Sequence, residues 1–228
     1  MYNILGIIPA RGGSKRIPYK NKKLLAGKEL IRYAVEATLQ SKLVTTVVVS
    51  SDDTDILNIA RSYAHVIAIQ RPDSISDDNA PSISYVHHAL ELLKNQYDYV
   101  VIIQPSSPFT LAEDIDNTIQ LLIDDNQADS SVSVMKLDHT IHPVKLKTLF
   151  NNQLIPFWEE EKGRMATHEL PELYVRNCSV YVSKFDLIKR DKIIGEHCLG
   201  YIMPRERSID INDPIDFDFA EFLMSYEK

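Results

Sequence analysis

The chain is poor in cysteine and has no long apolar run. Its two cysteines, Cys178 and Cys198, lie 20 positions apart, with no further Cys or His at metal-ligand spacing. Neither a disulfide framework nor a zinc site is therefore indicated, and we expect both thiols to be reduced. No apolar run approaches the roughly 20 residues that cross a bilayer, and the first residues lack the charged start of a signal peptide. These absences predict a cytoplasmic protein with no membrane partner.

Basic residues are also in the minority. The 228 residues include 25 Lys and Arg against 32 Asp and Glu, which gives a formal net charge of −7. Nucleic-acid binding needs an extended basic face to replace counterions, so this balance argues against it. A hydrophobic fraction of 44% and a charged fraction of 25% are ordinary for a globular protein. The length suits one domain, residues 1–228, better than two of equal size.

Apolar runs and helical periodicity alternate through the first half of the chain. Periodicity predicts helices over Thr54–Tyr63 and Ser82–Leu93, and apolar runs predict strands over Ile4–Ile8, Val47–Ser50, Val66–Ile69 and Tyr99–Ile103. This alternation predicts an α/β fold with a mostly parallel sheet flanked by helices. Ligands bind at the carboxyl ends of such strands, which here are Pro9–Arg11, Ser50–Asp53, Arg71–Pro72 and Gln104–Pro108.

The alternation loosens between residues 139 and 175. This segment is rich in His, Pro, Asn and charge, and it holds the single tryptophan, Trp158. We interpret it as an insertion that forms a dimerisation arm or covers the substrate, with a mobile loop as the alternative. Strand-like runs return at Asn177–Val182 and Leu199–Met203. A last helix is predicted after Asp213-Pro214 from the spacing of Ile215, Phe219, Phe222 and Leu223.

One short segment concentrates positive charge. Seven basic residues and no acidic one lie between Arg11 and Lys28, directly after the first predicted strand. Gly12 and Gly13 would let backbone N–H groups approach an anion, while Arg11 and Lys20 add charge, so we predict that the segment holds a polyphosphate. It contains neither a Walker A nor a Gly-x-Gly-x-x-Gly pattern. The alternative is an exposed basic turn, which is common on protein surfaces.

The basic segment and four later segments together resemble one enzyme family. In chain order they are Ala10-Arg11-Gly12-Gly13-Ser14-Lys15 with Lys20-Asn21, Arg71-Pro72 followed by Ser82, Gln104-Pro105-Ser106-Ser107-Pro108, Asn177 with Tyr181, and Ser208-Ile209-Asp210-Ile211-Asn212. This ordered set resembles the acylneuraminate cytidylyltransferases, the CMP-sialic acid synthetase family. The resemblance implies a nucleotide-diphosphosugar transferase-like fold, a homodimer and Mg²⁺ as cofactor. The implied reaction joins a nine-carbon 2-keto sugar acid to CTP, giving a CMP-sugar and pyrophosphate.

The resemblance also implies which residues bind CTP. The triphosphate would be held by Arg11, Ser14 and Lys20, and the ribose by Asn21 and Ser82. The cytosine would be held by Arg71 and by the backbone near Pro9, Ala10 and Ala80. Arg11, Lys20 and Asp210 would be the catalytic residues. Without the resemblance, we would interpret Arg71 as an ordinary surface arginine. An Arg at the carboxyl end of a strand can nevertheless donate a pair of hydrogen bonds to the edge of a base.

A second set of residues is implied for the acidic sugar, namely Gln104, Ser107, Lys145, Asn177 and Tyr181. In the family, basic residues of the arm reach the sugar carboxylate in the partner subunit's site, and Lys145 matches one of them. For Gln104 and Ser107 the alternative is plain turn chemistry, because Pro and Ser are common in turns. For Tyr181 the alternative is a half-buried strand aromatic.

Asp210 is the predicted Mg²⁺ ligand, because a hard cation on phosphate oxygens needs a carboxylate and takes few protein ligands. Alternation along an extended segment would place Asn212 on the same side, as a second, weaker ligand. Many relatives have a second Asp at this position, so the neutral amide of Asn212 leaves the choice between one and two metals open. Asp213 and Asp216 lie nearby, but capping of the next helix explains them.

Two further departures from the family pattern concern the sugar. Cys178 stands where relatives commonly carry Gly, and Thr167 stands where they carry Arg, with Arg164 displaced. These changes favour a sugar other than N-acetylneuraminate, such as legionaminate or pseudaminate, although the sequence does not select one nine-carbon acid. A cytidylyltransferase for the eight-carbon acid Kdo is the nearest alternative enzyme, although Lys20-Asn21 favours the nine-carbon branch. An alternative of another class is a CTP-binding module without catalysis.

Overall fold

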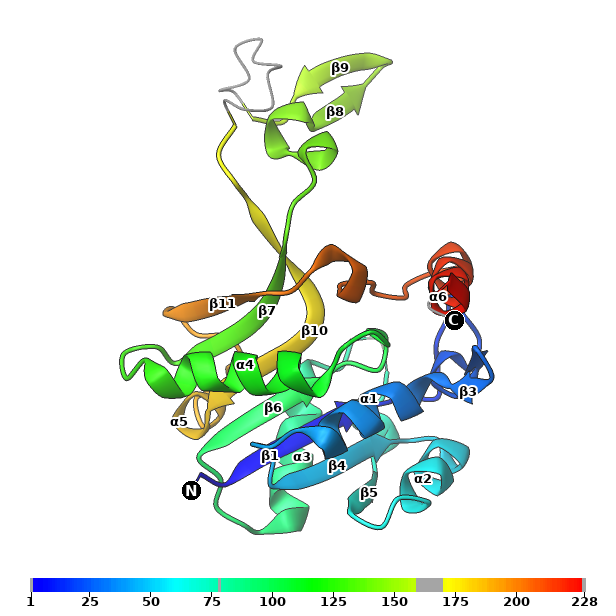
Figure 1. Cartoon of the computed structure of the whole chain (residues 1–228), viewed down its shortest axis with the longest axis vertical. Coiled ribbons are helices and arrows are strands. Elements are labelled where there is room, and N and C mark those ends of the chain that lie inside the picture. Colours follow the sequence, from blue (N-terminus) through cyan, green and yellow to red (C-terminus); the bar gives the residue numbers. More distant parts are fainter. Residues whose placement is uncertain (1, 78, 159–169, 227–228) are drawn as a thin grey trace.

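A seven-stranded sheet forms the centre of the protein. The computed structural model describes residues 2–77, 79–158 and 170–226. The strands lie in the order β11-β7-β10-β6-β1-β4-β5 (Figure 1). Their bounds are Ile4–Pro9 (β1), Thr46–Ser51 (β4), Val66–Gln70 (β5), Tyr99–Ile103 (β6), Ser130–Lys136 (β7), Tyr174–Lys184 (β10) and Cys198–Ile202 (β11). The four strands predicted in the first half of the chain are confirmed, each within one residue at either end.

The strand directions confirm a mostly parallel sheet. β1 is parallel to β4 and to β6, β4 is parallel to β5, and β11 is parallel to β7. β10 runs antiparallel to both of its neighbours, β6 and β7. The carboxyl ends of β1, β4, β5 and β6 therefore meet at one edge of the sheet, which is the edge where ligands bind in this class of fold.

The sequence does not predict β7, because three serines interrupt its apolar pattern. Ser130, Ser131 and Ser133 are all buried, and each hydroxyl has a partner. Ser131 donates to the carbonyl of Thr118 at 2.6 Å, and Ser133 donates to Oδ1 of Asn177 at 2.6 Å. Buried hydroxyls are tolerated when they are satisfied in this way. The strand is therefore central in spite of its polar composition.

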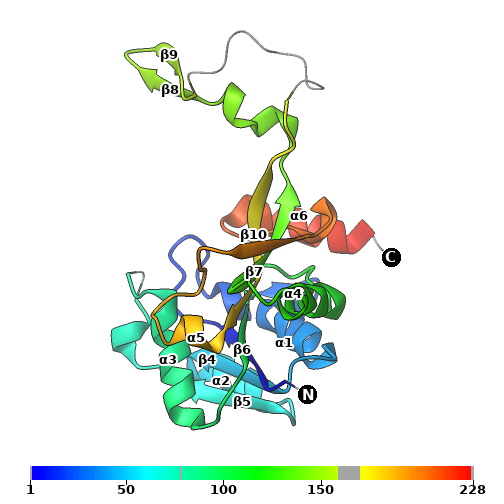
Figure 2. The ribbon, with the colours of Figure 1, turned by 90° about the vertical axis from the view of Figure 1, so that its left-hand side faces the viewer.

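Helices cover both faces of the sheet (Figure 2). α1, α2 and α4 pack on one face, and α3 and the short α5 pack on the other. In β1, Ile4 and Ile8 contact the first helix layer, whereas Leu5 and Ile7 contact the second. Continuous apolar strands are expected where both faces are covered. The helix bounds are Leu30–Gln40 (α1), Thr54–Arg61 (α2), Ser82–Leu93 (α3), Ala112–Asp124 (α4) and Phe185–Ile188 (α5).

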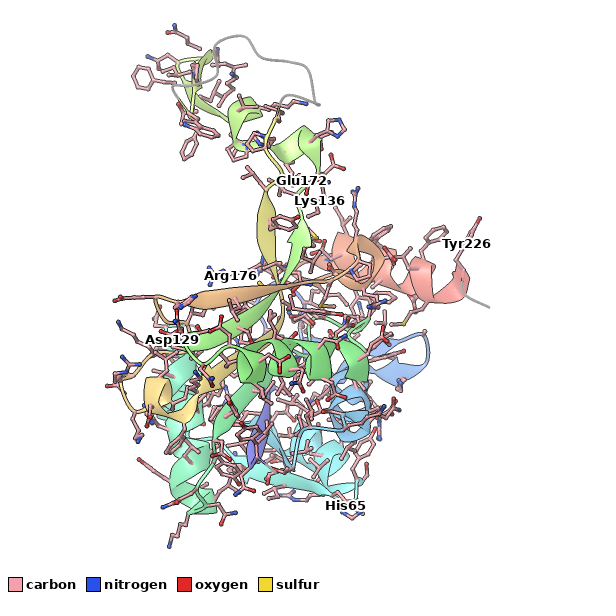
Figure 3. All side chains as sticks on the ribbon, turned by 60° about the vertical axis from the view of Figure 1, so that its left-hand side comes forward. His65, Asp129, Lys136, Glu172, Arg176 and Tyr226 are labelled. Atoms are coloured by element: carbon pink, nitrogen blue, oxygen red, sulfur yellow. The ribbon has the colours of Figure 1, made fainter. Side chains whose placement is uncertain are left out.

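Between β7 and β10 the chain leaves the sheet and forms a projecting arm (Figures 1 and 2). The arm holds two 3-10 helices and a hairpin, His139–Ile141 (η3), Pro143–Lys145 (η4), Lys147–Phe150 (β8) and Gln153–Pro156 (β9). Where the arm joins the sheet, Lys136 forms an ion pair with Glu172 (Figure 3). Of the predicted insertion 139–175, residues 139–158 and 170–173 lie on this arm and residues 174 and 175 already belong to β10, and the role of the insertion in dimerisation stays a prediction. Arg164 and Thr167 lie outside the described residues.

The last helix, α6 (Pro214–Tyr226), begins where the sequence predicts. Asp213 caps it, because its Oδ1 accepts from the backbone N–H groups of Ile215 at 2.9 Å and Asp216 at 3.0 Å. Ile215, Phe219 and Phe222 are nevertheless exposed, and the helix packs through Phe217 and Ala220. Helical spacing predicts the helix but does not say which face the rest of the fold covers. Among the described residues, no helix is both long and apolar enough to span a membrane.

Cys178 has a strained backbone in a bulge of β10. The register of β10 against β7 shifts between Arg176 and Tyr181, and Cys178 has φ of 59° there. This left-handed conformation costs an L residue roughly 1–2 kcal/mol. We expect Cys178→Gly to raise the free energy of unfolding by about 0.5–1 kcal/mol, because the relief of strain exceeds the entropy that glycine adds to the unfolded chain. Urea unfolding measures the change.

Cys178→Ala is the matched control for this prediction. It removes the thiol but keeps the Cβ atom, so the strain at this position remains. We expect no gain in stability from it. An equal gain from both variants would contradict strain as the cause and would assign the effect to the thiol.

Candidate active site

A pocket of about 220 Å³ opens at the edge of the sheet where the parallel strands end. Residues from five segments line it, because the ends of β1, β5 and β6, the start of α3 and the 3-10 helix Lys20–Lys22 converge there. Its walls are formed by Pro9, Arg11, Lys20, Asn21, Arg71, Ile75, Asp77, Ala80, Ser82, Tyr85, Gln104, Pro105 and Ser106. The structure thus brings together seven of the residues singled out in the sequence, namely Arg11, Lys20, Asn21, Arg71, Ala80, Ser82 and Gln104.

The loop that follows β1 is held by hydrogen bonds between its backbone and the side chains of Asp52 and Asn21. The N–H of Gly12 donates to Oδ1 of Asp52 at 2.8 Å, and the side-chain amide of Asn21 donates to the carbonyl of Arg11 at 2.9 Å. Gly12 has no room for a side chain, because an added Cβ would lie 2.9 Å from Cβ of Asp53. The loop therefore needs glycine at this point, and it presents Arg11 to the pocket.

The basic run divides into residues that line the pocket and residues that hold the structure. Lys22 pairs with Asp53 at 2.9 Å and Asp55 at 2.6 Å. The ammonium groups of Lys23 and Lys28 lie over aromatic rings, at 4.1 Å and 3.9 Å from the ring centroids of Phe217 and Tyr33. Of the run, Arg11 and Lys20 line the pocket itself. The sequence alone does not separate these two groups.

Lys20 is held rigidly at the pocket wall. Its Nζ donates to the carbonyl of Ile211 at 2.7 Å. Burial lowers the pKa of Lys20 below its ordinary value, and the nearby cations Arg16 and Arg11 act in the same direction. The carboxylate of Asp210 opposes this shift. A partly desolvated ammonium beside a second cation is a strong site for a phosphate group.

Arg71 is buried rather than exposed, which answers the alternative that it is an ordinary surface residue. It is 4% exposed, and its guanidinium donates to the Oγ and the carbonyl oxygen of Ser50 at 3.1 and 2.8 Å. Burial lowers its pKa. Two of five N–H donors are engaged by Ser50, so the guanidinium retains donors for a molecule in the pocket.

A second cavity of about 400 Å³ lies beside the pocket and shares Arg11 and Asp77 with it. Gly13, Ser14 and Lys15 line its other side. The two cavities therefore adjoin at Arg11 and Asp77, and Arg11, Lys15, Lys20 and Arg71 give their walls positive charge. Ser14 lines the second cavity and not the main pocket.

Asp210 and Asn212 lie on one side of an extended segment, as the alternation of the sequence predicts. The buried Ile211 anchors this segment, and its N–H donates to the carbonyl of Ser106 at 2.8 Å. The amide Nδ2 of Asn212 donates to Oδ2 of Asp210 at 2.7 Å, and its Oδ1 accepts from Arg16 at 3.2 Å. Oδ1 of Asp210 is buried and has no hydrogen-bond partner in the described part of the chain.

The residues implied for the sugar are spread more widely. Gln104 lines the pocket, whereas Ser107 is buried behind it and donates to the carbonyl of Cys178 at 3.4 Å. Tyr181 is half-buried on β10, where burial raises its pKa. Lys145 lies in η4 of the projecting arm. The structure does not gather these four side chains at one pocket.

Asn177 is enclosed within the protein. Its Oδ1 accepts from Ser133 at 2.6 Å, and its Nδ2 donates to Oγ of Ser208 at 2.9 Å. It is 4% exposed and does not line the pocket. These bonds join β7 and β10 to the segment that carries Asp210, so Asn177 has a structural task in this arrangement.

Sequence reasoning missed three residues that line the pocket, Ile75, Asp77 and Tyr85, and the last two are polar. Asp77 shapes the loop before α3, because its Oδ1 accepts from the N–H groups of Asn79 and Ala80 at 2.9 and 2.7 Å. The Asp-x-Asn pattern of this turn is a local signal that could have found it. Tyr85 carries no such signal, because it occupies an apolar position of a helix.

The fold and the pocket together define the class of protein. A mostly parallel sheet with a basic pocket at the carboxyl ends of its strands is the arrangement of an α/β protein that binds nucleotides. The chain belongs to the cytidylyltransferase family, whose family model matches residues 5–192. The family consists of nucleotidyltransferases.

Individual relatives agree with this assignment. A pseudaminic acid cytidylyltransferase of Campylobacter jejuni is 30% identical over 223 residues, which cover 96% of this chain and 95% of that protein. An N-acylneuraminate cytidylyltransferase of Escherichia coli is 29% identical over 217 residues, 95% of this chain. The chain spans about half the length of the latter, 51%.

A solved structure supports the fold independently. The structure of CMP:2-keto-3-deoxy-manno-octonic acid synthetase complexed with CTP matches with a TM-score of 0.72 at 17% sequence identity. The match covers 99% of this chain and 100% of that one. The predicted nucleotidyltransferase-like fold is confirmed.

Proposed function

We propose that the protein transfers a cytidylyl group from CTP to a nine-carbon 2-keto sugar acid of the sialic, legionaminic or pseudaminic type. The anomeric oxygen of the sugar attacks the α-phosphorus, the bond from that phosphorus to the β-phosphate oxygen breaks, and pyrophosphate leaves with the CMP-sugar as the other product. The observation that carries this proposal is the convergence of Arg11, Lys20 and Arg71 on one pocket in a cytidylyltransferase fold. The cytoplasm, where CTP is made, is the proposed place of reaction.

The family resemblance assigns a role to each of these residues, and their places in the two cavities support the assignment. Arg11, Lys20 and Ser14 would bind the triphosphate, because they line the two adjoining cavities and two of them are cationic. Asn21 and Ser82 would hold the ribose, and the buried Arg71 with the backbone at Ala80 would read cytosine. Positioning and charge neutralisation of this kind supply most of the catalysis in phosphoryl-type transfer.

Gln104 is the proposed contact to the sugar within the pocket, with Ser107 and Tyr181 beside it and Lys145 supplied by the arm of a second subunit. The buried Asn177 is better placed to support the Asp210 segment than to touch the sugar, because Ser133 and Ser208 occupy its amide. N-acylneuraminate and pseudaminate relatives are similar to this chain to the same degree, so identity does not select the sugar.

Asp210 fits a divalent cation, and we propose Mg²⁺. Its Oδ1 is buried and has no hydrogen-bond partner among the described residues, whereas a buried carboxylate oxygen normally has one. Within the described ranges no group of three or more His, Cys, Asp or Glu is placed to hold a metal, so phosphate oxygens and water would complete the shell. A bound cation would supply positive charge to the phosphate oxygens. Asn212 directs its NH₂ toward Asp210, so its amide would have to turn over to act as a second ligand.

The reaction is tested by pyrophosphate release from CTP and Mg²⁺ with N-acetylneuraminate, legionaminate, pseudaminate and Kdo in parallel. We expect release with one nine-carbon acid, and its loss in Asp210→Ala. Release with Kdo alone would favour the eight-carbon alternative. CTP binding without release from any acid would contradict the enzyme and favour a binding module.

The lowered pKa of Lys20 predicts a pH dependence of CTP binding. Its ammonium loses the proton at a lower pH than an exposed lysine does, so CTP affinity should fall as pH rises through that lowered pKa. Lys20→Arg keeps a positive charge up to about pH 12, so its CTP affinity should change less over the same pH range. Calorimetric titration of CTP from pH 7 to 10 compares the two slopes. Parallel slopes would exclude Lys20 as the titrating group.

We also propose that the protein is a homodimer joined through the arm. Leu149, Phe150, Leu154 and Phe157 of the arm are each between 65% and 68% exposed, which is unusual for large apolar side chains of a monomer. Phe150→Asp should therefore give a monomer in analytical ultracentrifugation that still binds CTP. Leu92→Asp, the same kind of change at an exposed position of α3, is the control and should leave a dimer. A wild-type monomer would contradict the proposal.

A further inference from the structure

Tyr85 is the pocket residue whose chemistry the proposed function does not use. It lies in the first turn of α3, three residues after Ser82, and it lines the pocket. The side chain is almost completely buried, with 6% of the residue exposed. An apolar helix position explains the ring, but it does not explain a hydroxyl at the wall of a polar pocket.

The hydroxyl of Tyr85 has no hydrogen-bond partner among the described residues. Ser82 and Gln104 lie beside it and act on its pKa, but neither makes a hydrogen bond of normal geometry with it. Burial is the larger influence and raises the pKa of the phenol, so the group is a neutral donor at physiological pH. A buried hydroxyl is rarely left unpaired, and here the hydroxyl lies just beneath the pocket surface, beside the lining residues Ser82 and Gln104. A molecule that binds in the pocket and shifts either of these side chains can therefore supply the missing acceptor.

The ring of Tyr85 has a second contact, with Arg71. Cζ of the guanidinium lies 4.8 Å from the ring centroid, within the range of a cation–π interaction. The backbone and Oγ of Ser50 hold the edge of the same guanidinium. The ring of Tyr85 and the contacts of Ser50 together fix the plane of the Arg71 guanidinium. The hydroxyl of Tyr85 lies next to Ser82 and Gln104.

We propose that Tyr85 is a substrate-binding residue of this pocket, whose hydroxyl donates a hydrogen bond to an oxygen of the bound substrates between Ser82 and Gln104. This inference rests on the proposed function. Ser82 is assigned to the ribose and Gln104 to the acidic sugar, so the acceptor is an alcohol or carboxylate oxygen at the junction of the two. A ribose hydroxyl and a sugar oxygen offer the same acceptor chemistry, and binding measurements separate them.

Tyr85→Phe is the decisive variant, because it removes only the hydroxyl and keeps the ring against Arg71. Calorimetry with CTP, 2′-deoxy-CTP and 3′-deoxy-CTP, together with the KM of the sugar, gives the result. If the ribose is the acceptor, CTP affinity falls about three- to tenfold, and the loss disappears with the deoxynucleotide that lacks the acceptor. If the sugar is the acceptor, its KM rises by a similar factor while CTP affinity is unchanged.

Stability separates binding from a structural role. The hydroxyl has no hydrogen-bond partner in the part of the chain that the structure describes, so Tyr85→Phe should leave the unfolding midpoint unchanged or raise it while binding weakens. A structural hydroxyl would lower the midpoint instead. Tyr97→Phe is the matched control for binding, because Tyr97 is buried outside the pocket, where its hydroxyl accepts from Asn95 at 3.5 Å, and this variant should leave the binding of CTP and sugar unchanged.

Two outcomes would overturn the inference, namely unchanged binding of CTP and sugar in Tyr85→Phe, or a loss that accompanies a lower unfolding midpoint. Both are judged against wild-type protein that binds CTP and releases pyrophosphate. A wild-type protein that does neither contradicts the proposed function itself, so the two failures are distinguishable.

Discussion

Asp210→Asn should lower kcat/KM for pyrophosphate release by about a thousandfold, or about 4 kcal/mol of transition-state stabilisation. The variant keeps the size of the side chain and its ability to bond Asn212, but it removes the anionic oxygen. Oδ1 of Asp210 is buried and has no hydrogen-bond partner within residues 2–77, 79–158 and 170–226, and Lys20 lies close enough to interact with the carboxylate. Steady-state release of pyrophosphate across a Mg²⁺ titration measures the loss.

Asp213→Ala is the control for that variant. Asp213 lies three residues further along and caps α6 through the N–H groups of Ile215 and Asp216. Its loss should cost about 1 kcal/mol of stability and leave the turnover at saturating Mg²⁺ unchanged. If Asp210→Asn retains full turnover at saturating Mg²⁺ while Asp213→Ala loses it, the metal assignment is wrong.

Lys20→Met should weaken CTP binding about a hundredfold. The methionine has a similar length but no charge, and hydrogen bonds to charged groups contribute about 1.5–3 kcal/mol. Lys20 lines the pocket and is fixed there by the carbonyl of Ile211 at 2.7 Å. Calorimetry with CTP in the presence of Mg²⁺ gives the affinity directly.

Lys22→Met tests whether position or total charge decides this effect. Both variants change the net charge of the protein equally, but Lys22 is engaged by Asp53 and Asp55 and does not line the pocket. Lys22 and Asp53 are half-buried and Asp55 is exposed, and ion pairs at such a surface contribute about 1 kcal/mol or less to stability. CTP affinity should stay within twofold or so. Equal losses in the two variants would mean that general electrostatics, rather than Lys20, binds the triphosphate.

Strand positions and the edge of the sheet that holds the pocket were predictable from the sequence. Val47–Ser50 and Tyr99–Ile103 are apolar throughout, which is the local signal of a strand covered on both faces. The polar residues that follow such strands have to gather at one edge, because parallel strands end together. The extended segment at Asp210 was also predictable, since alternation by itself places Asn212 on the same side.

Other features depend on contacts between distant segments. The sequence could not show that Asn177 is enclosed by Ser133 and Ser208, because these residues lie 44 and 31 positions away. Nor could it show that Arg71 is buried against the ring of Tyr85. It also could not show that Ile215, Phe219 and Phe222 of α6 are exposed. Each depends on which surface of one element meets another, and local periodicity carries no information on that.

The sequence by itself determined where six of the seven strands of the central sheet lie, which segments meet at the pocket and which family the chain resembles, because backbone preference, apolar periodicity and motif order are local properties. Tertiary structure alone decided which members of the basic run face a ligand and which pair with Asp53, Asp55 or an aromatic ring. It also brought the unpaired hydroxyl of Tyr85 to the wall of the pocket. Seven similar charges in one segment acquire different tasks only when distant carboxylates, carbonyls and rings are folded against some of them.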